Sequence, residues 1–189
     1  MYIAVAVLGC ALMMPVLNRA LSTHPRLLRT IRMGLLVSYL LMNLYETLLF
    51  NRVPGYAEYE LSLFWSYRAS LALSKTNDGF HLYITDFRLF RQILLNILLY
   101  VPFGYLLPFA LPRLAEKRQD KQRRALPAYP WNVVLIGIAF SLTVELLQLI
   151  LKLGLFEFDD IFNNTVGCLL GIGLYHVLVR LLLKKKEPA

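Results

Sequence analysis

Long apolar runs with few charges alternate with shorter polar segments along the chain. Three runs contain no charged residue, over residues 1–18, 92–112 and 161–179. Two further runs, 33–51 and 131–151, contain one charge each, Glu46 and Glu145. A helix needs about 20 mostly apolar residues to cross about 30 Å of hydrocarbon. The pattern therefore predicts an all-α polytopic membrane protein with five transmembrane helices, over residues 2–18, 33–51, 92–112, 131–151 and 161–180.

The composition agrees with this architecture. The 189 residues are 58% hydrophobic and 17% charged, with a mean hydropathy of +0.55, whereas a soluble domain is about half apolar and about a quarter charged. Outside the predicted spans, only residues 52–91 and 113–130 are long enough to hold further structure, and neither reaches ordinary domain size. We therefore expect one membrane domain over residues 1–189 and no large soluble domain.

The basic residues are distributed unevenly between the two sides of this membrane domain. Fourteen of the 20 Lys and Arg lie in alternate segments, at 19–32, 113–124 and 180–186. The remaining six lie on the other side, at Arg52, Arg68, Lys75, Arg88, Arg91 and Lys152. Because cytoplasmic segments carry the excess of Lys and Arg, this asymmetry predicts that the N-terminus is outside. It also predicts an extracytoplasmic loop over 52–91, a basic cytoplasmic loop over 113–130 and a cytoplasmic C-terminus.

The net charge of +8 is also typical of nucleic-acid-binding proteins. Here, however, the basic residues adjoin helix ends, where they determine orientation and contact lipid headgroups. We therefore predict membrane lipids as partners and no nucleic acid. Cys10 and Cys168 both lie within spans and have no metal-ligand spacing, and the G-x-S-x-G and H-E-x-x-H motifs of soluble enzymes do not occur. The sequence thus predicts no metal and no cofactor, and directs attention to polar residues inside the membrane.

Polar residues of four predicted spans lie at one common depth. At about 1.5 Å of rise per residue, Glu145 lies about 9 Å below the outer end of its span, and Glu46 lies about 7.5 Å below the outer end of its own. The same arithmetic places six ligand-binding candidates in the outer leaflet, namely Glu46, Asn96, Glu145, Gln148, Asp160 and Asn164. Glu145 and Gln148 share one helical face at i and i+3. These positions predict a polar pocket in the outer leaflet, covered by the long outer loop.

Small residues and a proline are predicted to control helix packing. One face of the last span carries four residues at helical spacing, namely Asp160, Asn164, Gly167 and Gly171. The two glycines form a G-x-x-x-G pair that lets a partner helix approach closely, so this face should contact protein and not lipid. In the third span, Pro102 removes a backbone hydrogen bond and Gly104 follows it, so we expect that helix to kink or break there.

Each polar candidate also has a purely structural interpretation. A carboxylate inside a span costs about 2.5 to 3.5 kcal/mol on insertion scales, so Glu145 is expected to face a cavity or a partner. Asn96 and Gln148 can equally serve as hydrogen-bonding contacts between helices. Glu46 lies nearer the interface, where a basic side chain of the outer loop could pair with it. For Asp159, capping the last span is the favoured interpretation.

Three motifs in the second half of the chain resemble the blocks of the VanZ-like family. They are an N-P-F-G block within Asn96–Gly104, an E-x-x-Q block at Glu145–Gln148 and a D-D-x-x-x-N-x-x-G block at Asp159–Gly167. Each occurs once, in the family's order, and together they cover residues 91 to about 180. The outer-loop segment 64–68 is similar to an aromatic segment that precedes the third span in many members. Its Trp65 and Arg68 join the ligand-binding candidates.

The resemblance implies a multi-pass protein of the bacterial plasma membrane that contributes to low-level resistance to glycopeptides of the teicoplanin type. Lipid-linked cell-wall precursors and the acyl tail of a lipoglycopeptide both lie in the outer leaflet, where the polar pocket is predicted. We therefore favour a protein that binds such an amphiphile. One alternative is an intramembrane enzyme with Glu145 and Asp160 as catalytic acid and base, although no nucleophile or metal set is obvious. The other is a transporter, against which the chain shows no inverted repeat.

Overall fold

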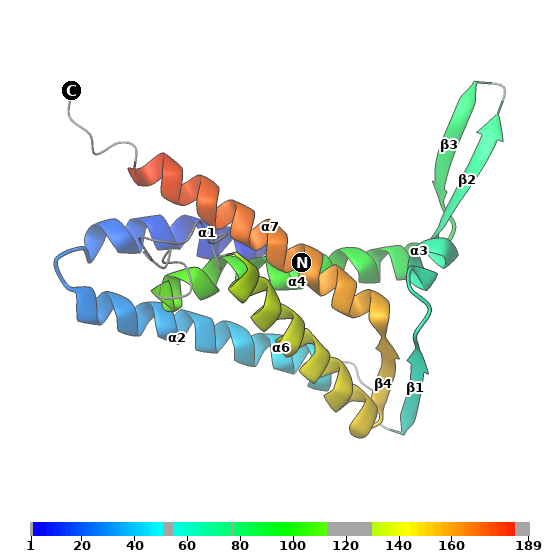
Figure 1. Ribbon diagram of the computed structural model, residues 1–189, viewed down its shortest axis with the longest axis horizontal. Coiled ribbons are helices and arrows are strands. Elements are labelled where there is room, and N and C mark those ends of the chain that lie inside the picture. The colour runs from blue at the N-terminus through cyan, green and yellow to red at the C-terminus, as the bar shows by residue number, and fades with distance from the viewer. Residues whose placement is uncertain (1, 51–54, 77, 113–129, 184–189) are drawn as a thin grey trace, which may run out of the picture.

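The computed structural model describes residues 2–50, 55–76, 78–112 and 130–183, and these residues are mostly helical (Figure 1). The long helices are α1 (Tyr2–Ala20), α2 (Pro25–Leu44), α4 (Phe87–Ala110), α6 (Trp131–Ile150) and α7 (Phe158–Leu183). A short π-helix, η1 (Tyr45–Leu49), continues α2, and a short helix, α3 (Trp65–Ser70), precedes α4 in the chain.

The described residues also contain short strands, namely β1 (Tyr56–Glu60), β2 (Leu71–Thr76), β3 (Gly79–Ile84) and β4 (Leu153–Glu157). Strand β1 pairs in parallel with β4, from Tyr56 opposite Leu153 to Glu60 opposite Glu157. Strands β2 and β3 form an antiparallel hairpin. The prediction of an all-α fold is therefore wrong. The strands lie between helices, where backbone groups without a helical partner pair with one another instead.

Four helices in the described part of the chain are long and apolar enough to cross a membrane, at Pro25–Leu49, Phe87–Ala110, Trp131–Ile150 and Phe158–Leu178. They correspond to the second to fifth predicted spans. The second begins at Pro25 instead of residue 33, because proline is favourable at a first helical position and hydropathy detects only the apolar part of a helix. Helix α1 coincides with the first predicted span, 2–18, whose membrane crossing stays a prediction. Residues 113–129 of the basic loop lie outside the described residues.

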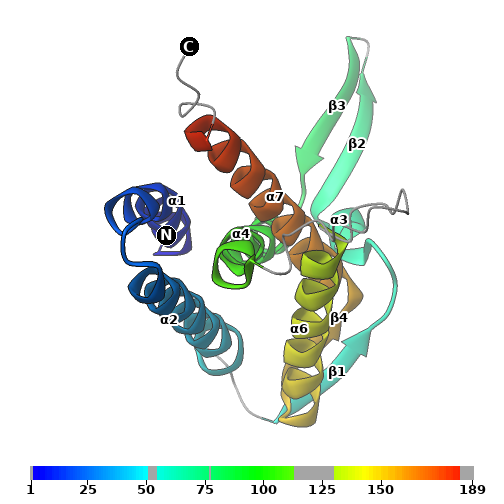
Figure 2. The same cartoon turned by 60° about the vertical axis from the view of Figure 1, so that its left-hand side comes forward.

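Helix α4 lies at the centre of the helical bundle. Figure 2 shows α1 and α2 on one side of it and α6 and α7 on the other. Every residue of α4 from Leu99 to Ala110 is buried, because this stretch is apolar all round and contacts helices on both sides. The ends of α2 and α6, the beginnings of α4 and α7, helix α3 and both sheets lie together at one end of the bundle (Figure 1). We call it the loop end.

Helices α4 and α7 pack backbone against backbone. A Cβ atom placed on Gly167 would lie 2.0 Å from the carbonyl oxygen of Ile97, and one placed on Gly171 would lie 2.1 Å from that of Val101. Gly104 of α4 faces the backbone of α7 in the same way, again at 2.0 Å. These distances are far inside van der Waals contact, so only glycine fits at the three positions.

A kink or a break was predicted at Pro102, and helix α4 passes through this residue without a break. Pro102 has no N–H to donate to the carbonyl oxygen of Leu98. Its side chain is fully buried, and the residues that follow it are buried as well. Packing from the surrounding helices therefore maintains the helix across the missing hydrogen bond.

The orientation of the bundle is open to a direct labelling test. Ser74 is exposed on β2 at the loop end, and Ser22 is exposed in the turn between α1 and α2. In a Cys10→Ala background, we expect a membrane-impermeant maleimide added to intact cells to label Ser74→Cys and to spare Ser22→Cys. Permeabilised cells, as the control, should show both labelled. The opposite pattern in intact cells would place the loop end in the cytoplasm and contradict the orientation derived from the basic residues.

Candidate functional site

Buried polar side chains gather towards the loop end of the bundle. Within the described residues, eight of them come from α2, α6, β4 and α7. We call the eight without Asp159 the polar cluster: Asn43, Ser141, Glu145, Gln148, Glu157, Asn163 and Asn164. Each is at most 5% exposed. Buried polar groups in an apolar bundle need hydrogen-bonding partners, so their contacts indicate what this region can do.

One face of α6 connects three neighbouring elements through side-chain hydrogen bonds. Ser141 Oγ accepts a hydrogen bond of 2.8 Å from Asn164 Nδ2 of α7. Glu145 Oε2 accepts one of 3.3 Å from the backbone N–H of Glu157, at the end of β4. Gln148 Nε2 donates one of 3.1 Å to the carbonyl oxygen of Thr47 in η1. The spacing of i, i+4 and i+7 aligns these three α6 side chains on one face.

Helix α2 contributes a second set of hydrogen bonds, which connect it to α4. Asn43 Nδ2 donates a hydrogen bond of 3.2 Å to the hydroxyl oxygen of Tyr39, whose O–H donates in turn to the carbonyl oxygen of Leu99 in α4. Tyr100, the next residue of α4, is also buried. Polar groups of α2 are therefore hydrogen-bonded to the central helix, α4.

Several amide atoms of the site have no hydrogen-bond partner among the described residues. They are Asn43 Oδ1, Asn163 Nδ2, Asn164 Oδ1 and, from half-buried Asn96 of α4, the Nδ2 atom. Each unsatisfied buried polar group costs about 1–3 kcal/mol. Four such atoms near one end of an apolar bundle indicate a place where water or a polar ligand group completes the hydrogen bonding.

The carboxylate of Asp159, in the first turn of α7, binds the start of α3. Its Oδ1 accepts a hydrogen bond of 2.6 Å from Phe64 N–H, and its Oδ2 accepts two, of 2.9 Å and 2.6 Å, from the N–H and hydroxyl of Ser66. Phe64 adopts a left-handed conformation with a φ of 62°, which turns the chain so that these donors converge. Asp159 is completely buried. It therefore caps α3 and holds the segment that contains α3 against α7.

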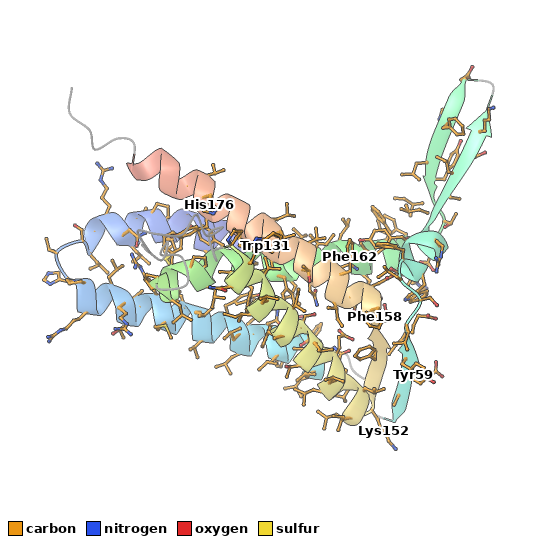
Figure 3. The ribbon with its side chains drawn as sticks, viewed as in Figure 1. Tyr59, Trp131, Lys152, Phe158, Phe162 and His176 are labelled. Carbon is orange, nitrogen blue, oxygen red and sulfur yellow. The ribbon has the colours of Figure 1, made fainter. Side chains whose placement is uncertain are left out.

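A second contact between α3 and α7 lies one turn further along. Tyr67 donates a hydrogen bond of 2.5 Å to Asn163 Oδ1, and the rings of Phe64 and Phe162 pack edge to face at 5.1 Å. Figure 3 shows Phe158 and Phe162 at the start of α7, whereas His176 lies towards its other end. Burial, with the nearby carboxylates of Asp159 and Asp160, raises the pKa of Tyr67. Its hydroxyl therefore keeps the proton that it donates.

The predicted ligand-binding candidates differ in how deeply the structure buries them. Glu145, Gln148 and Asn164 belong to the polar cluster. Four candidates are half-buried, namely Glu46 in η1, Trp65 in α3, Asn96 in α4 and Asp160 in α7. Arg68 is exposed on α3. In the described ranges, no group of three or more His, Cys, Asp or Glu side chains could hold a metal ion.

Asn163, Tyr67 and Glu157 were not among the predicted ligand-binding candidates, and capping of its own helix was the favoured role of Asp159. The carboxylate instead caps α3, which precedes it by more than 90 residues. The Asp-Asp and Asn-Asn doublets were the sequence feature that could have indicated these contacts. Neighbouring helical residues point in directions about 100° apart, so the second member of each doublet faces a different element from the first.

These features define a helical membrane protein with a buried polar site at one end of its bundle. The chain belongs to the VanZ/LLP1 family, whose family model matches residues 35–180. It is similar to Protein VanZ from Enterococcus faecium, with 34% identity over 86 residues. These residues are 46% of this chain and 45% of that protein, so the match spans about half the length of the relative. No solved structure matches the chain.

Proposed function

We propose that the polar cluster binds the polar part of an amphiphile in the outer leaflet, a lipid-linked cell-wall precursor or a lipoglycopeptide. Through this binding the protein contributes to low-level resistance to glycopeptides of the teicoplanin type. The unpartnered amide atoms of Asn43, Asn163 and Asn164 support the binding. A ligand that forms hydrogen bonds with these atoms removes the free-energy cost of leaving them unsatisfied, and this favours the bound state. Membership of the VanZ/LLP1 family supports the link to resistance.

The side chains of the cluster favour an uncharged ligand group. The cluster contains the carboxyl groups of Glu145 and Glu157 and three asparagines, and it contains no Lys or Arg. A phosphate group would require basic partners. Sugar hydroxyls and peptide amides instead both donate and accept hydrogen bonds. They can therefore bind the unpartnered oxygens of Asn43 and Asn164 as well as the unpartnered nitrogen of Asn163. Both proposed ligands carry sugars and peptide bonds.

The alternative function is an intramembrane enzyme acting on a lipid-linked substrate with Glu145 and Asp160 as acid and base. The observation in its favour is that the two carboxyl groups have unlike surroundings, since Glu145 is 3% exposed and Asp160 is half-buried. Such differences separate the roles of paired carboxylates. Comparing the lipids of a deletion strain with those of wild type distinguishes the two functions. An enzyme leaves its substrate accumulated, and a binding protein does not.

Substitutions in the cluster test the proposed function. Glu145→Gln keeps the size of the side chain and one acceptor oxygen, replaces the other oxygen by an NH2 donor and removes the ability to ionise. Asn164→Ala removes the contact with Ser141. We expect both variants to accumulate in the membrane and to return the teicoplanin susceptibility of a sensitive host to that of cells without the gene.

Thr143→Val is the matched control for this experiment, because Thr143 lies on the exposed face of the same helix, and it should keep full resistance. If Glu145→Gln and Asn164→Ala both preserve resistance at normal protein levels, the cluster is not the binding site. In a separate experiment, calorimetric titration of the purified protein with teicoplanin distinguishes direct binding of the drug from binding of a wall precursor.

A further inference from the structure

The β2–β3 hairpin has one apolar and one polar face. Its register places Leu71 opposite Ile84, Leu73 opposite Leu82, and Lys75 opposite Phe80. Residues directly opposite each other share a face, and successive residues alternate between faces. Five apolar side chains and Lys75 therefore share one face. The other face carries Ala72 with Tyr83 and Ser74 with His81.

The apolar face is uncovered. Leu73, Phe80 and Leu82 are 67%, 69% and 66% exposed. A single two-stranded hairpin is marginally stable in water without something to pack against, and contiguous apolar surface of this kind marks a contact with a membrane or another protein. The hairpin thus requires a partner that the described residues do not provide.

The position of the hairpin points to the bilayer as that partner. Strand β3 ends at Ile84, and α4, one of the four apolar helices, begins at Phe87. Figure 1 shows the hairpin extending across the direction of α1, α2 and α4 and not along it. A hairpin that starts at the end of a membrane span and extends sideways follows the membrane surface. Strands of six residues reach about 20 Å along it.

The base of the hairpin is held in this direction by α3. Thr85 donates two hydrogen bonds, from its N–H to the carbonyl oxygen of Ser70 at 2.8 Å and from its Oγ1 to that of Ala69 at 2.9 Å. Asp86 caps α4 by accepting from Arg88 N–H and Leu89 N–H. Helices α3 and α4 therefore both restrict the hairpin, and its sideways course is part of the fold.

We propose that the β2–β3 hairpin is a lipid-binding anchor whose apolar face lies in the interfacial layer of the bilayer beside the bundle. Leu73, Phe80 and Leu82 contact the acyl chains. The ammonium group of Lys75 lies 5.8 Å above the ring of Phe80 and reaches from the apolar face to lipid phosphates, as long basic side chains do at interfaces. This role is independent of the polar cluster and of any resistance function.

Site-directed fluorescence on the full-length protein in lipid nanodiscs tests the anchor. Leu82→Cys and His81→Cys, in a Cys10→Ala background, place a dye on the apolar and polar faces of one strand. The nanodiscs contain phosphatidylcholine and phosphatidylglycerol and hold one copy of the protein. We expect lipids spin-labelled near the headgroup to quench the dye at position 82 severalfold more than the dye at position 81. Aqueous iodide should give the reverse order.

A second pair on the facing strand guards against local misfolding. Leu73→Cys should behave like Leu82→Cys, and Ser74→Cys should behave like His81→Cys, because the register pairs these positions. Equal iodide quenching on both faces would mean that the hairpin lies in water and would overturn the anchor. A dye at position 82 that escapes both quenchers in these discs would show that protein covers the apolar face, and would equally overturn the anchor.

Discussion

Gly171→Ala is expected to lower the free energy of unfolding by about 3 kcal/mol, at the upper end of the range for overpacked cores, and to reduce accumulation of the protein in the membrane. The added methyl group would lie 2.1 Å from the carbonyl oxygen of Val101 and close to the backbone of Tyr105 and Gly104. All the obstructing atoms belong to the backbone, so no side chain can rotate away. The helices α4 and α7 would have to separate.

Gly173→Ala is the matched control, two residues further along the same helix. A Cβ atom on Gly173 meets nothing within 4 Å, and alanine is favoured over glycine in a helix by about 1 kcal/mol. This variant should therefore be as stable as the unmodified protein or slightly more stable. Thermal unfolding in detergent, followed by circular dichroism, measures both variants. Equal stability of Gly171→Ala and Gly173→Ala would contradict the close approach of the two backbones.

Asp159→Ala is expected to release α3 and the segment around it from α7. The substitution removes three hydrogen bonds to a carboxylate, and bonds of this charged type are worth about 1.5–3 kcal/mol each. It also leaves the buried N–H of Ser66 without its acceptor. Because bonds to one carboxylate are lost together and are not additive, we expect a combined loss of about 3 kcal/mol or more. The loss should be concentrated in α3 and the loop around it.

Amide hydrogen exchange reports this local opening directly. In Asp159→Ala, the amides of Phe64 and Ser66 should exchange at least about a hundredfold faster, the factor that corresponds to about 3 kcal/mol, while amides of α4 keep their protection. Ser66→Ala removes only the hydroxyl bond and should have a smaller effect. Asp78→Ala removes an exposed carboxylate of the same loop and should have none. Unchanged exchange at Phe64 in Asp159→Ala would show that the carboxylate does not hold the loop.

Prediction from sequence succeeded where the controlling physics is local. Four of the five predicted spans coincide with helices that are long and apolar enough to cross a membrane, because the cost of placing charges in hydrocarbon depends on each residue and its neighbours. Glu145 and Gln148 were placed on one face by helical spacing alone. Strands β1 and β4 escaped prediction, because residues 56–60 and 153–157 pair across almost a hundred residues, and neither segment has a strong period of its own.

The sequence by itself determined the family, the apolar helices and the common face of Glu145 and Gln148, because hydropathy, motif spacing and helical spacing are properties of single segments. Only the tertiary structure decided which side chain each polar group meets. Asp159 bonds to Phe64 and Ser66, and Asn163 bonds to Tyr67. Those partners depend on how closely α7 approaches α4. The glycines make the close approach possible, and the packing of the two whole helices brings it about.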